Sequence, residues 1–393
     1  MSIDNLFVGD LVLELGVASI SKQGESICGD FWCQESKDDQ RIVVLSDGMG
    51  SGVKANILAT LTAKMLSAMM AGDIPIDECI MTISETLPMC RERKLAYATF
   101  TALKLQGTTA YMARYDNPPA LLIRQGKPMR YPYGVQFVGE KEIHETTLRL
   151  EEGDLLLLMS DGITQAGRGK TGDGWPSEEV AALAAQIDRD DMSPQRIAAM
   201  ILRAAHALNL DEADDDATVI AIKARQRYAV NMMIGPPKNR ADDEATMRLF
   251  FSKAGAHVVC GGTTSKTVAA YLGKEVFIKE DTATEEVPAM SRIEGVDLVT
   301  EGLLTLRATL DLVRKYRRDC MMTLELENRK KDGASCLAEL LLERASDVNI
   351  FFGTSVNTSN MTQDMSFQSK LGLAKDLEKE LTELGKNVKI SMC

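Results

Sequence analysis

The sequence has few of the side chains that build histidine- or cysteine-based active sites. Its 393 residues include only three histidines, and its eight cysteines are scattered. The closest pair, Cys28 and Cys33, is not part of a CxxC motif joined by a second such motif or a histidine pair, so we expect no structural zinc site. The simplest interpretation is that the cysteines are free thiols in a reducing compartment.

Long apolar runs are also missing. The longest ones, such as residues 155–159, fall far short of the ~20 residues that a membrane-spanning helix needs. The first residues lack a charged region followed by an apolar one, which a secretory signal would require. We therefore expect a cytoplasmic protein that does not bind membranes.

Positive charge is in deficit as well. There are 45 Lys and Arg residues against 57 Asp and Glu residues, a net charge of −12. Short basic clusters at residues 314–318 and 329–331 fit solvated helix faces. Because phosphate neutralisation supplies most of the affinity for nucleic acids, we expect no nucleic-acid partner.

The length and composition fit two globular domains. Hydrophobic residues make up 45% and charged residues 26% of the chain, and a typical domain has roughly 100–200 residues. We place the boundary after residue 225, giving domains at 1–225 and 226–393. Runs of strands followed by runs of helices predict an α+β fold for the first domain.

The most distinctive stretch ends a predicted buried strand at residues 42–47. The apolar run stops at Ser46-Asp47-Gly48, and Gly50 and Gly52 follow before a predicted helix at 53–70. Such a strand end brings a carboxylate to a sheet edge with almost no side chain beside it. This arrangement suits either a hard cation or a phosphate group.

Aspartates next to strands recur at four places. They are Asp30, Asp47, Asp161 and the pair Asp215 and Asp216. Asp161 stands in a second Ser-Asp-Gly sequence after the apolar run 155–159. Asp30 precedes a hairpin-sized spacer, so two antiparallel strands would bring it close to Asp47.

A single aspartate at a strand end usually makes a turn or caps a helix. Four such places are harder to explain in that way. Carboxylates that converge without cationic partners raise each other's pKa, so a cluster of them needs cations for stability. Oxygen ligands without histidine or cysteine favour Mg²⁺ or Mn²⁺, and Gly48 lets its own carbonyl approach a metal closely.

The predicted helix at 53–70 carries two apolar stripes. Ile57, Leu61, Met65 and Met69 recur every four residues, and Leu58 and Leu66 lie on a second stripe. Such a helix packs on more than one surface. Burial in the core is the simpler interpretation and a homodimer contact the alternative. A second helix is predicted at about 77–90, and strands are predicted at 97–105, 108–115 and 120–124.

Residues 1–225 resemble the metal-dependent protein phosphatases of the PPM (PP2C) superfamily, in the bacterial SpoIIE-type serine phosphatase branch. The resemblance is carried, in the family's order and approximate spacing, by Gly29-Asp30, by residues 45–52 and 98–101, by Asn117-Pro118-Pro119 with 120–122, by Gly153-Asp154-Leu155, by Ser160-Asp161-Gly162 and by residues 215–218. It implies a β-sandwich of two antiparallel sheets flanked by helices, with two Mn²⁺ or Mg²⁺ ions at one edge.

The resemblance also implies roles for single residues. Asp47 would bridge both ions, the Gly48 carbonyl would complete one shell, and Asp161 and Asp215 would hold one ion. Asp30 would contribute directly or through water. Which acid of residues 214–216 binds metal is left open, although Asp215 matches the motif. The sequence departs from the family at residues 115–117, where relatives often carry Ala-Gly-His or Ala-Gly-Asn, and this departure bears on substrate specificity.

The expected mechanism follows from the ions. Water between two divalent cations is acidic enough to supply hydroxide near neutral pH. That hydroxide would attack a phosphoserine or phosphothreonine in line, while the ions stabilise the phosphoryl oxygens. On this hypothesis Asp47, Asp161 and Asp30 are the catalytic acids. Relatives act on phosphorylated bacterial regulatory proteins, and some are controlled by a shift of helices that would correspond here to 53–70 and 77–90.

The second half of the chain has a different pattern of predicted secondary structure. Strands at 230–234, 256–260, 296–299, 349–352 and 388–390 alternate with polar loops and helices, which predicts a smaller doubly wound α/β domain. Ligands bind such sheets beyond the carboxyl ends of the strands. A small anionic effector could therefore bind the backbone N–H groups of Gly261, Gly262, Thr263 and Thr264. A docking or dimerisation role is an equal alternative, and no Walker A motif is present.

Two other functions remain open for the first domain. Residues 48–52 could form the phosphate loop of a nucleotide- or anion-binding sensor, although Val53 stands where a third glycine or alanine belongs. Asp47 would also put negative charge against the phosphate. A degenerate phosphatase that serves only as a scaffold is the third hypothesis, and the intact set of acids argues against it.

Overall fold

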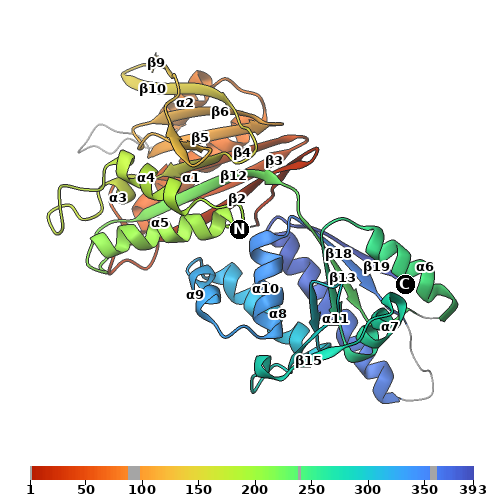
Figure 1. The fold of residues 1–393 in the computed structure, drawn as a ribbon. Helices are drawn as coiled ribbons and strands as arrows, with labels where there is room; N and C mark the ends of the chain where they lie inside the picture. The colour runs from red at the N-terminus through yellow and green to blue at the C-terminus, as the bar shows by residue number, and fades with distance from the viewer. Residues whose placement is uncertain (1, 87–97, 238–239, 355–360) are drawn as a thin grey trace. The chain divides into compact units, whose positions relative to one another are not determined.

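The computed structural model of the chain describes residues 2–86, 98–237, 240–354 and 361–393. These residues divide into two compact units, Ile3–Gln226 and Arg227–Cys393 (Figure 1). Each unit contains its own sheets and its own apolar core. The units are therefore described one at a time.

The first unit is a sandwich of two six-stranded antiparallel sheets. Sheet 1 has the order β1 (Leu6–Val8), β2 (Leu11–Ile20), β12 (Ala217–Gln226), β11 (Leu155–Met159), β7 (Leu121–Arg124) and β8 (Lys127–Met129). Sheet 2 has the order β3 (Asp30–Lys37), β4 (Gln40–Asp47), β5 (Thr99–Gln106), β6 (Thr109–Tyr115), β10 (Lys141–Arg149) and β9 (Gly134–Val138). The predicted α+β sandwich of two antiparallel sheets is confirmed.

Alternation along each strand builds the core between the sheets. On β4, Val43 and Leu45 face sheet 1, whereas Ile42 and Val44 face the helices on the outer side. All four side chains are buried. The strand therefore has a continuous apolar run rather than an alternating pattern, because both of its faces are covered.

Helices cover the outer faces of the sandwich. Over sheet 2 lie α1 (Gly52–Ala71) and α2 (Ile76–Thr86), while α5 (Pro194–Leu208) lies on β2 and β12 of sheet 1 and α4 (Ser177–Ile187) lies on β7 and β8 (Figure 1). The predicted second helix was longer, but its residues 87–90 lie outside the described part of the chain. The same is true of Tyr97, the predicted first residue of β5.

The expected burial of α1 is only partly correct. The side facing sheet 2 is built from small residues such as Ala59 and Ala63 together with Leu66. Ile57 and Leu61, which belong to the four-residue stripe, are 51% and 41% exposed. The small side chains let the helix approach the sheet closely. Ile57 and Leu61, the first two residues of the stripe, point away from the sheet.

The second unit is a three-layer α/β domain, as predicted. Its seven-stranded sheet has the order β15 (Phe277–Lys279), β16 (Met290–Arg292), β17 (Leu298–Thr300), β14 (Ala256–Cys260), β13 (Ala229–Ile234), β18 (Asp347–Phe352) and β19 (Asn387–Met392). The five strands from β17 to β19 are parallel. In chain order they run 3-2-1-4-5, which is the order of a doubly wound sheet.

Helices pack on both faces of this sheet. One apolar cluster joins it to α6 (Arg240–Ser252) and α7 (Gly262–Leu272). The other cluster joins it to α8 (Leu303–Arg318), α9 (Met322–Asn328), α10 (Gly333–Glu339) and α11 (Met361–Glu383). The predicted third strand was placed at 296–299, but β17 begins only at Leu298, because the Val296 N–H donates to the Ile293 carbonyl at 3.1 Å in a preceding turn.

Two sequence-based expectations about composition can also be compared with the structure. The seven cysteines within the described residues are free thiols. Among the helices in that part of the chain, none has the length and apolar character needed to cross a bilayer.

The contact between β2 and α5 gives a test of the sandwich. A Cβ added to Gly16 would lie 2.1 Å from the backbone nitrogen of Gln195 at the start of α5. We expect Gly16→Ala to lower the free energy of unfolding by about 1–3 kcal/mol, the usual cost of overpacking. Chemical denaturation of the purified protein measures it. Gly134→Ala is the matched control, because its added Cβ would meet only the Glu145 carbonyl oxygen at 3.9 Å, and an equal loss in both variants would contradict the prediction.

Candidate metal centre

The aspartates singled out in the sequence meet at one end of the first sandwich. Asp30 is the first residue of β3 and Asp47 the last of β4, and the two are direct partners in the antiparallel ladder. Their side chains therefore leave the same face of sheet 2. The predicted proximity of Asp30 and Asp47 is confirmed.

Sheet 1 supplies the other acids from two neighbouring strands. Asp161 begins the short helix α3 (Asp161–Thr164), directly after β11. Asp215 and Asp216 precede β12. The two strand ends are joined where Ser160 N–H donates to the Thr218 carbonyl at 3.1 Å and Thr218 N–H donates to Ser160 Oγ at 2.9 Å.

Glycines allow these strand ends to approach one another. A Cβ on Gly29 would lie 2.5 Å from Asp216 Oδ2, and one on Gly162 would lie 2.1 Å from the Asp216 carbonyl oxygen. A Cβ on Gly48 would lie 2.1 Å from the carbonyl oxygen of Ala55 in α1. Any side chain at these three positions would force the acids apart or displace α1.

Burial and mutual repulsion shift the acids away from their ordinary ionisation. Burial, followed by the charges of Asp216 and Asp161, raises the pKa of Asp30 from 3.8 to about 7, although nearby hydroxyls oppose the shift. Burial, followed by the charges of Asp30 and Asp161, raises the pKa of Asp47 to about 10. Burial also raises the pKa of Asp215, with Lys22 opposing the shift. Without a cation this end of the sandwich resists full ionisation.

Several carboxylate oxygens here have no hydrogen-bond donor. Both oxygens of Asp30, which is 5% exposed, and Oδ2 of Asp216 are buried without a partner. The hydroxyls of Ser160 and Thr218 lie close enough to favour the charged form of Asp30, but neither makes a hydrogen bond of ordinary geometry to it. Buried oxygens without donors are what a hard cation would satisfy.

The acids are neighbours in space rather than a finished coordination shell. Within the described residues, no three His, Cys, Asp or Glu side chains stand in an arrangement ready to hold a metal ion. The donor set itself is entirely oxygen, as the sequence predicted. It therefore fits Mg²⁺ or Mn²⁺ by chemistry, while the side chains must still adjust around an ion.

The structure separates the three acids at residues 214–216. Asp214 points to the surface, where its Oδ1 lies 2.8 Å from Lys170 Nζ. Asp215 Oδ1 accepts a hydrogen bond from the Asp216 N–H at 3.0 Å. The charge of Asp215 helps to raise the pKa of Asp47. Asp216 is 3% exposed, and its Oδ1 accepts the Lys22 N–H at 3.0 Å.

Asp216 was not among the metal ligands predicted from the sequence. The direction in which Asp216 projects was nevertheless predictable from the sequence. Ile220 and Ile222 of β12 face the other sheet, and strand alternation gives residues 218 and 216 the same side. Asp216, rather than Asp215, therefore projects toward Asp30, whereas motif matching alone selected Asp215.

The glycine-rich loop before α1 does not offer a free helix terminus. Ser51 Oγ donates to Glu25 Oε1 at 3.0 Å. Glu25 Oε2 lies so close to Gly52 that an added Cβ would come within 2.4 Å of it. A carboxylate thus already occupies the position that a bound phosphate would take in a nucleotide loop.

The predicted anion site of the second unit lies at the N-terminus of α7, where Gly261 follows β14 and Gly262, Thr263 and Thr264 form the first turn of the helix. Gly261 has a φ of +113°, and its N–H donates to the Thr300 carbonyl at 3.0 Å. A Cβ on Gly302 would lie 3.5 Å from Gly261 Cα and 3.8 Å from Lys370 Nζ of α11. Two glycine turns and one cation therefore share the carboxyl edge of the parallel sheet.

Comparison with known proteins gives matches for the first unit. The family model described as Stage II sporulation protein E (SpoIIE) matches residues 37–225. Stage II sporulation protein E of Bacillus subtilis (strain 168) is 24% identical over 217 residues, which cover 53% of this chain and 25% of the relative. The protein of the same name from Priestia megaterium is 24% identical over 221 residues, covering 54% of this chain and 36% of the relative.

The chain thus spans about a quarter of one of these curated relatives and about a third of the other. Among solved structures, the phosphatase domain of the cell fate determinant SpoIIE from Bacillus subtilis is 20% identical. The matched region covers 55% of this chain and 94% of the phosphatase-domain chain, with a TM-score of 0.44. Residues 37–225 of the first unit therefore match the SpoIIE family model, the family that the motifs of this unit resemble.

Proposed function

We propose that the first unit is a Mn²⁺- or Mg²⁺-dependent protein phosphatase that hydrolyses phosphoserine or phosphothreonine of a regulatory protein. The observation that carries the proposal is the convergence of Asp30, Asp47, Asp161 and Asp216 with buried oxygens that lack donors. A group of acids that opposes its own ionisation is costly unless it binds cations. The match to the SpoIIE family model supports the same activity.

The residues that would hold the ions are Asp47, the Gly48 carbonyl, Asp161 and Asp215, with Asp30 contributing from β3. We add Asp216, which faces Asp30. When bound, the ions would supply hydroxide near neutral pH and neutralise the phosphoryl oxygens.

The chain's own groups orient these acids. Gln165 Nε2 donates to Asp161 Oδ2. This hydrogen bond from a residue one helical turn later holds the Asp161 carboxylate in place. Ser46 Oγ donates to the Thr99 carbonyl at 3.0 Å, which ties the end of β4 to β5. Gly50 leaves open space near Asp47 for a phosphate group, because no heavy atom lies within 4 Å of a Cβ added there.

A nucleotide- or anion-binding role for residues 48–52 has less support. In a phosphate loop, the helix N-terminus faces the phosphate with free N–H groups. Here the Glu25 carboxylate faces the start of α1. It would repel a phosphate at that position.

The second unit and the exposed stripe on α1 are candidates for regulation. We propose that a small anion binds at Gly261–Thr264, close to Lys370, and tunes the phosphatase. We also propose that Ile57 and Leu61, exposed beside the acid-bearing loop, take part in a homodimer or in control through α1. A docking or dimerisation role for the second unit is the alternative.

The first test measures hydrolysis of p-nitrophenyl phosphate. We expect turnover that requires Mn²⁺ or Mg²⁺, and a loss of at least about 100-fold in kcat for Asp47→Ala and Asp161→Ala, since each removes charge that stabilises the transition state. Asp10→Asn, an exposed residue in the β1–β2 turn, should keep full activity. Undiminished activity in EDTA would refute metal dependence.

The second test uses the repulsion among the acids. Because the folded protein raises the pKa of Asp47 from 3.8 to about 10, metal-free protein should lose stability as pH rises from about 4 toward 10. Removing the charge with Asp47→Asn should therefore raise the free energy of unfolding of metal-free protein at pH 8 by about 1–3 kcal/mol. Thermal denaturation in EDTA measures it.

Added Mn²⁺ should reverse that order, stabilising the wild type more than Asp47→Asn. The exposed-site variant Asp10→Asn serves again as the control and should follow the wild type in both conditions. A lower melting temperature for Asp47→Asn in EDTA would show that the acids do not repel one another as described.

The third test concerns the carboxyl edge of the second unit. Pyrophosphate at ten times its dissociation constant should stabilise the wild-type protein by about 1.4 kcal/mol, and Lys370→Ala should remove most of that gain. Differential scanning calorimetry in EDTA avoids effects of the metal centre. Lys379→Ala, an exposed change on the same helix, should respond like the wild type, and an identical response of all three proteins would exclude Lys370 from an anion site.

A further inference from the structure

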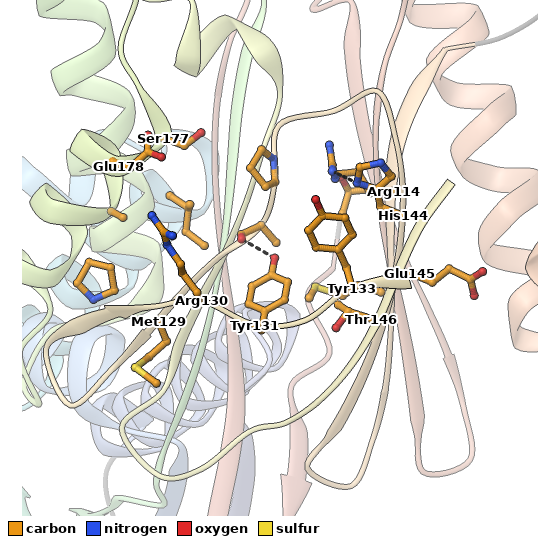
Figure 2. Close-up of a pocket in the computed structure, with 17 residues that line it drawn as sticks. Arg114, Met129, Arg130, Tyr131, Tyr133, His144, Glu145, Thr146, Ser177 and Glu178 are labelled. Atoms are coloured by element: carbon orange, nitrogen blue, oxygen red, sulfur yellow. Dashed lines mark hydrogen bonds between the residues drawn. The ribbon is translucent and has the colours of Figure 1, made fainter. Parts of the chain in front are cut away.

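A pocket of about 480 Å³ lies in the first unit (Figure 2). One wall is the inner face of sheet 2, with Met112 and Arg114, and another is α4, with Ser177. The segment that follows β8 crosses between these walls, and Figure 2 shows Tyr131 and Tyr133 of this segment beside the hollow. The pocket is therefore built from both layers of the sandwich.

Strand register connects this pocket to the acids. Asp47 lies opposite Thr99 on β5, and two residues further along β5 Thr101 lies opposite Arg114 on β6. Arg114 in turn lies opposite His144 on β10. Residues that face each other across a ladder, or that are two apart along a strand, share one face of the sheet. The pocket residues Thr101, Arg114 and His144 therefore project from the same face as Asp47.

The separation is short. Neighbouring strands are ~4.8 Å apart and alternate residues along a strand ~7 Å apart, so Arg114 is displaced from Asp47 by about 12 Å at the backbone. Asn117 spans part of this gap, accepting from Thr99 Oγ1 at 2.6 Å and donating to Thr101 Oγ1 at 3.3 Å. An extended peptide covers about 12 Å with three or four residues.

The chemistry of the walls is apolar with fixed polar groups. Arg114 Nη1 donates to the Asn117 carbonyl at 2.6 Å and Nη2 contacts His144, which stacks on Tyr133 with ring centroids 4.9 Å apart. Among the described carboxylates, none lies within ion-pair distance of Arg114. Tyr131 is held by the hydrogen bond that its hydroxyl donates to the Ala120 carbonyl at 2.6 Å.

The rim of the pocket is exposed and apolar. Met129 and Tyr133 are 44% and 59% exposed. An aromatic or thioether side chain left open to water beside a hollow of this size is free to cover an incoming apolar group. The pocket thus offers an apolar chamber at a peptide's reach from the acids.

We propose that this pocket is a substrate subsite, which takes an apolar side chain of the phosphoprotein three or four residues from the phosphoserine. The proposal rests on the proposed phosphatase function. A phosphoprotein is the occupant that this function brings to the acids, and its chain must continue over a surface next to them. The pocket opens from the same face of sheet 2 as Asp47. Its distance from Asp47 is one that three or four residues of an extended peptide can span. Substrate choice would then depend on the sequence around the phosphoserine.

The test uses nine-residue phosphopeptides with phosphoserine at the centre. In each peptide, leucine or alanine occupies the third and fourth positions either before or after the phosphoserine. Gly or Ser occupies all remaining positions. We expect one leucine peptide to be hydrolysed with a kcat/KM about tenfold above its alanine counterpart, mainly through KM. The double variant Met129→Ala with Tyr133→Ala should reduce this preference to about twofold or less while hydrolysing p-nitrophenyl phosphate at the wild-type rate.

Phe137→Ala is the matched control, because this side chain on β9 is 68% exposed and does not line the pocket. It should keep the preference for leucine. Equal kcat/KM values for leucine and alanine peptides, or a preference that survives the double variant, would overturn the subsite.

A binding measurement separates failure of the subsite from failure of the phosphatase. Fluorescence anisotropy of the labelled peptides in EDTA reports docking without hydrolysis. There the preferred leucine peptide should bind the wild type about tenfold more tightly than its alanine counterpart. Equal binding together with active p-nitrophenyl phosphate turnover would remove the subsite alone, whereas absence of that turnover with either metal would remove both proposals.

Discussion

Carboxylates held together away from water are the constraint on which the first unit depends. Asp30 and Asp47 are fixed by strand pairing, and Asp161 and Asp216 by the opposite sheet. Neither sheet can withdraw its acids without losing ladder hydrogen bonds. Burial and repulsion are therefore both retained in the folded state, and together they raise the pKa values of Asp30 and Asp47. A cation is the partner that would turn this cost into binding free energy.

The same register that gathers the acids also orders the surface beside them. Successive rows across sheet 2 run from Asp47 and Thr99 to Thr101, Arg114 and His144. The inner face changes along one direction from acidic, through hydroxyl and amide groups, to cationic and aromatic. One sheet thus carries acids of the proposed metal centre and one wall of the proposed subsite, so that strand register fixes the spacing between them.

Much of this arrangement was predictable from the sequence because its signals are local. Ser46-Asp47-Gly48 and Ser160-Asp161-Gly162 each mark the end of a buried strand, and pairing of adjacent strands gave the proximity of Asp30 and Asp47. The alternation of strands and helices predicted the doubly wound α/β fold of the second unit. The motifs also carried the family resemblance, which implied the sandwich before its topology was known.

Other features depend on contacts between distant segments. The direction in which Asp216 projects depends on how β12 packs, whereas motif matching pointed to Asp215. The exposure of Ile57 and Leu61 depends on how closely small residues let α1 approach sheet 2. The pocket joins sheet 2 to α4 and to the segment after β8. No single stretch of sequence contains such a contact.

The complete burial of β4 has an evolutionary consequence. Residues 42–45 are at most 1% exposed, since one side of the strand faces the other sheet and the opposite side faces the helices. A polar or larger residue along this segment would disturb one of two cores. Variation among descendants of this chain is therefore confined to the ends of the strand and the loops beyond them. A fixed interior leaves the rim as the place where new specificities can arise.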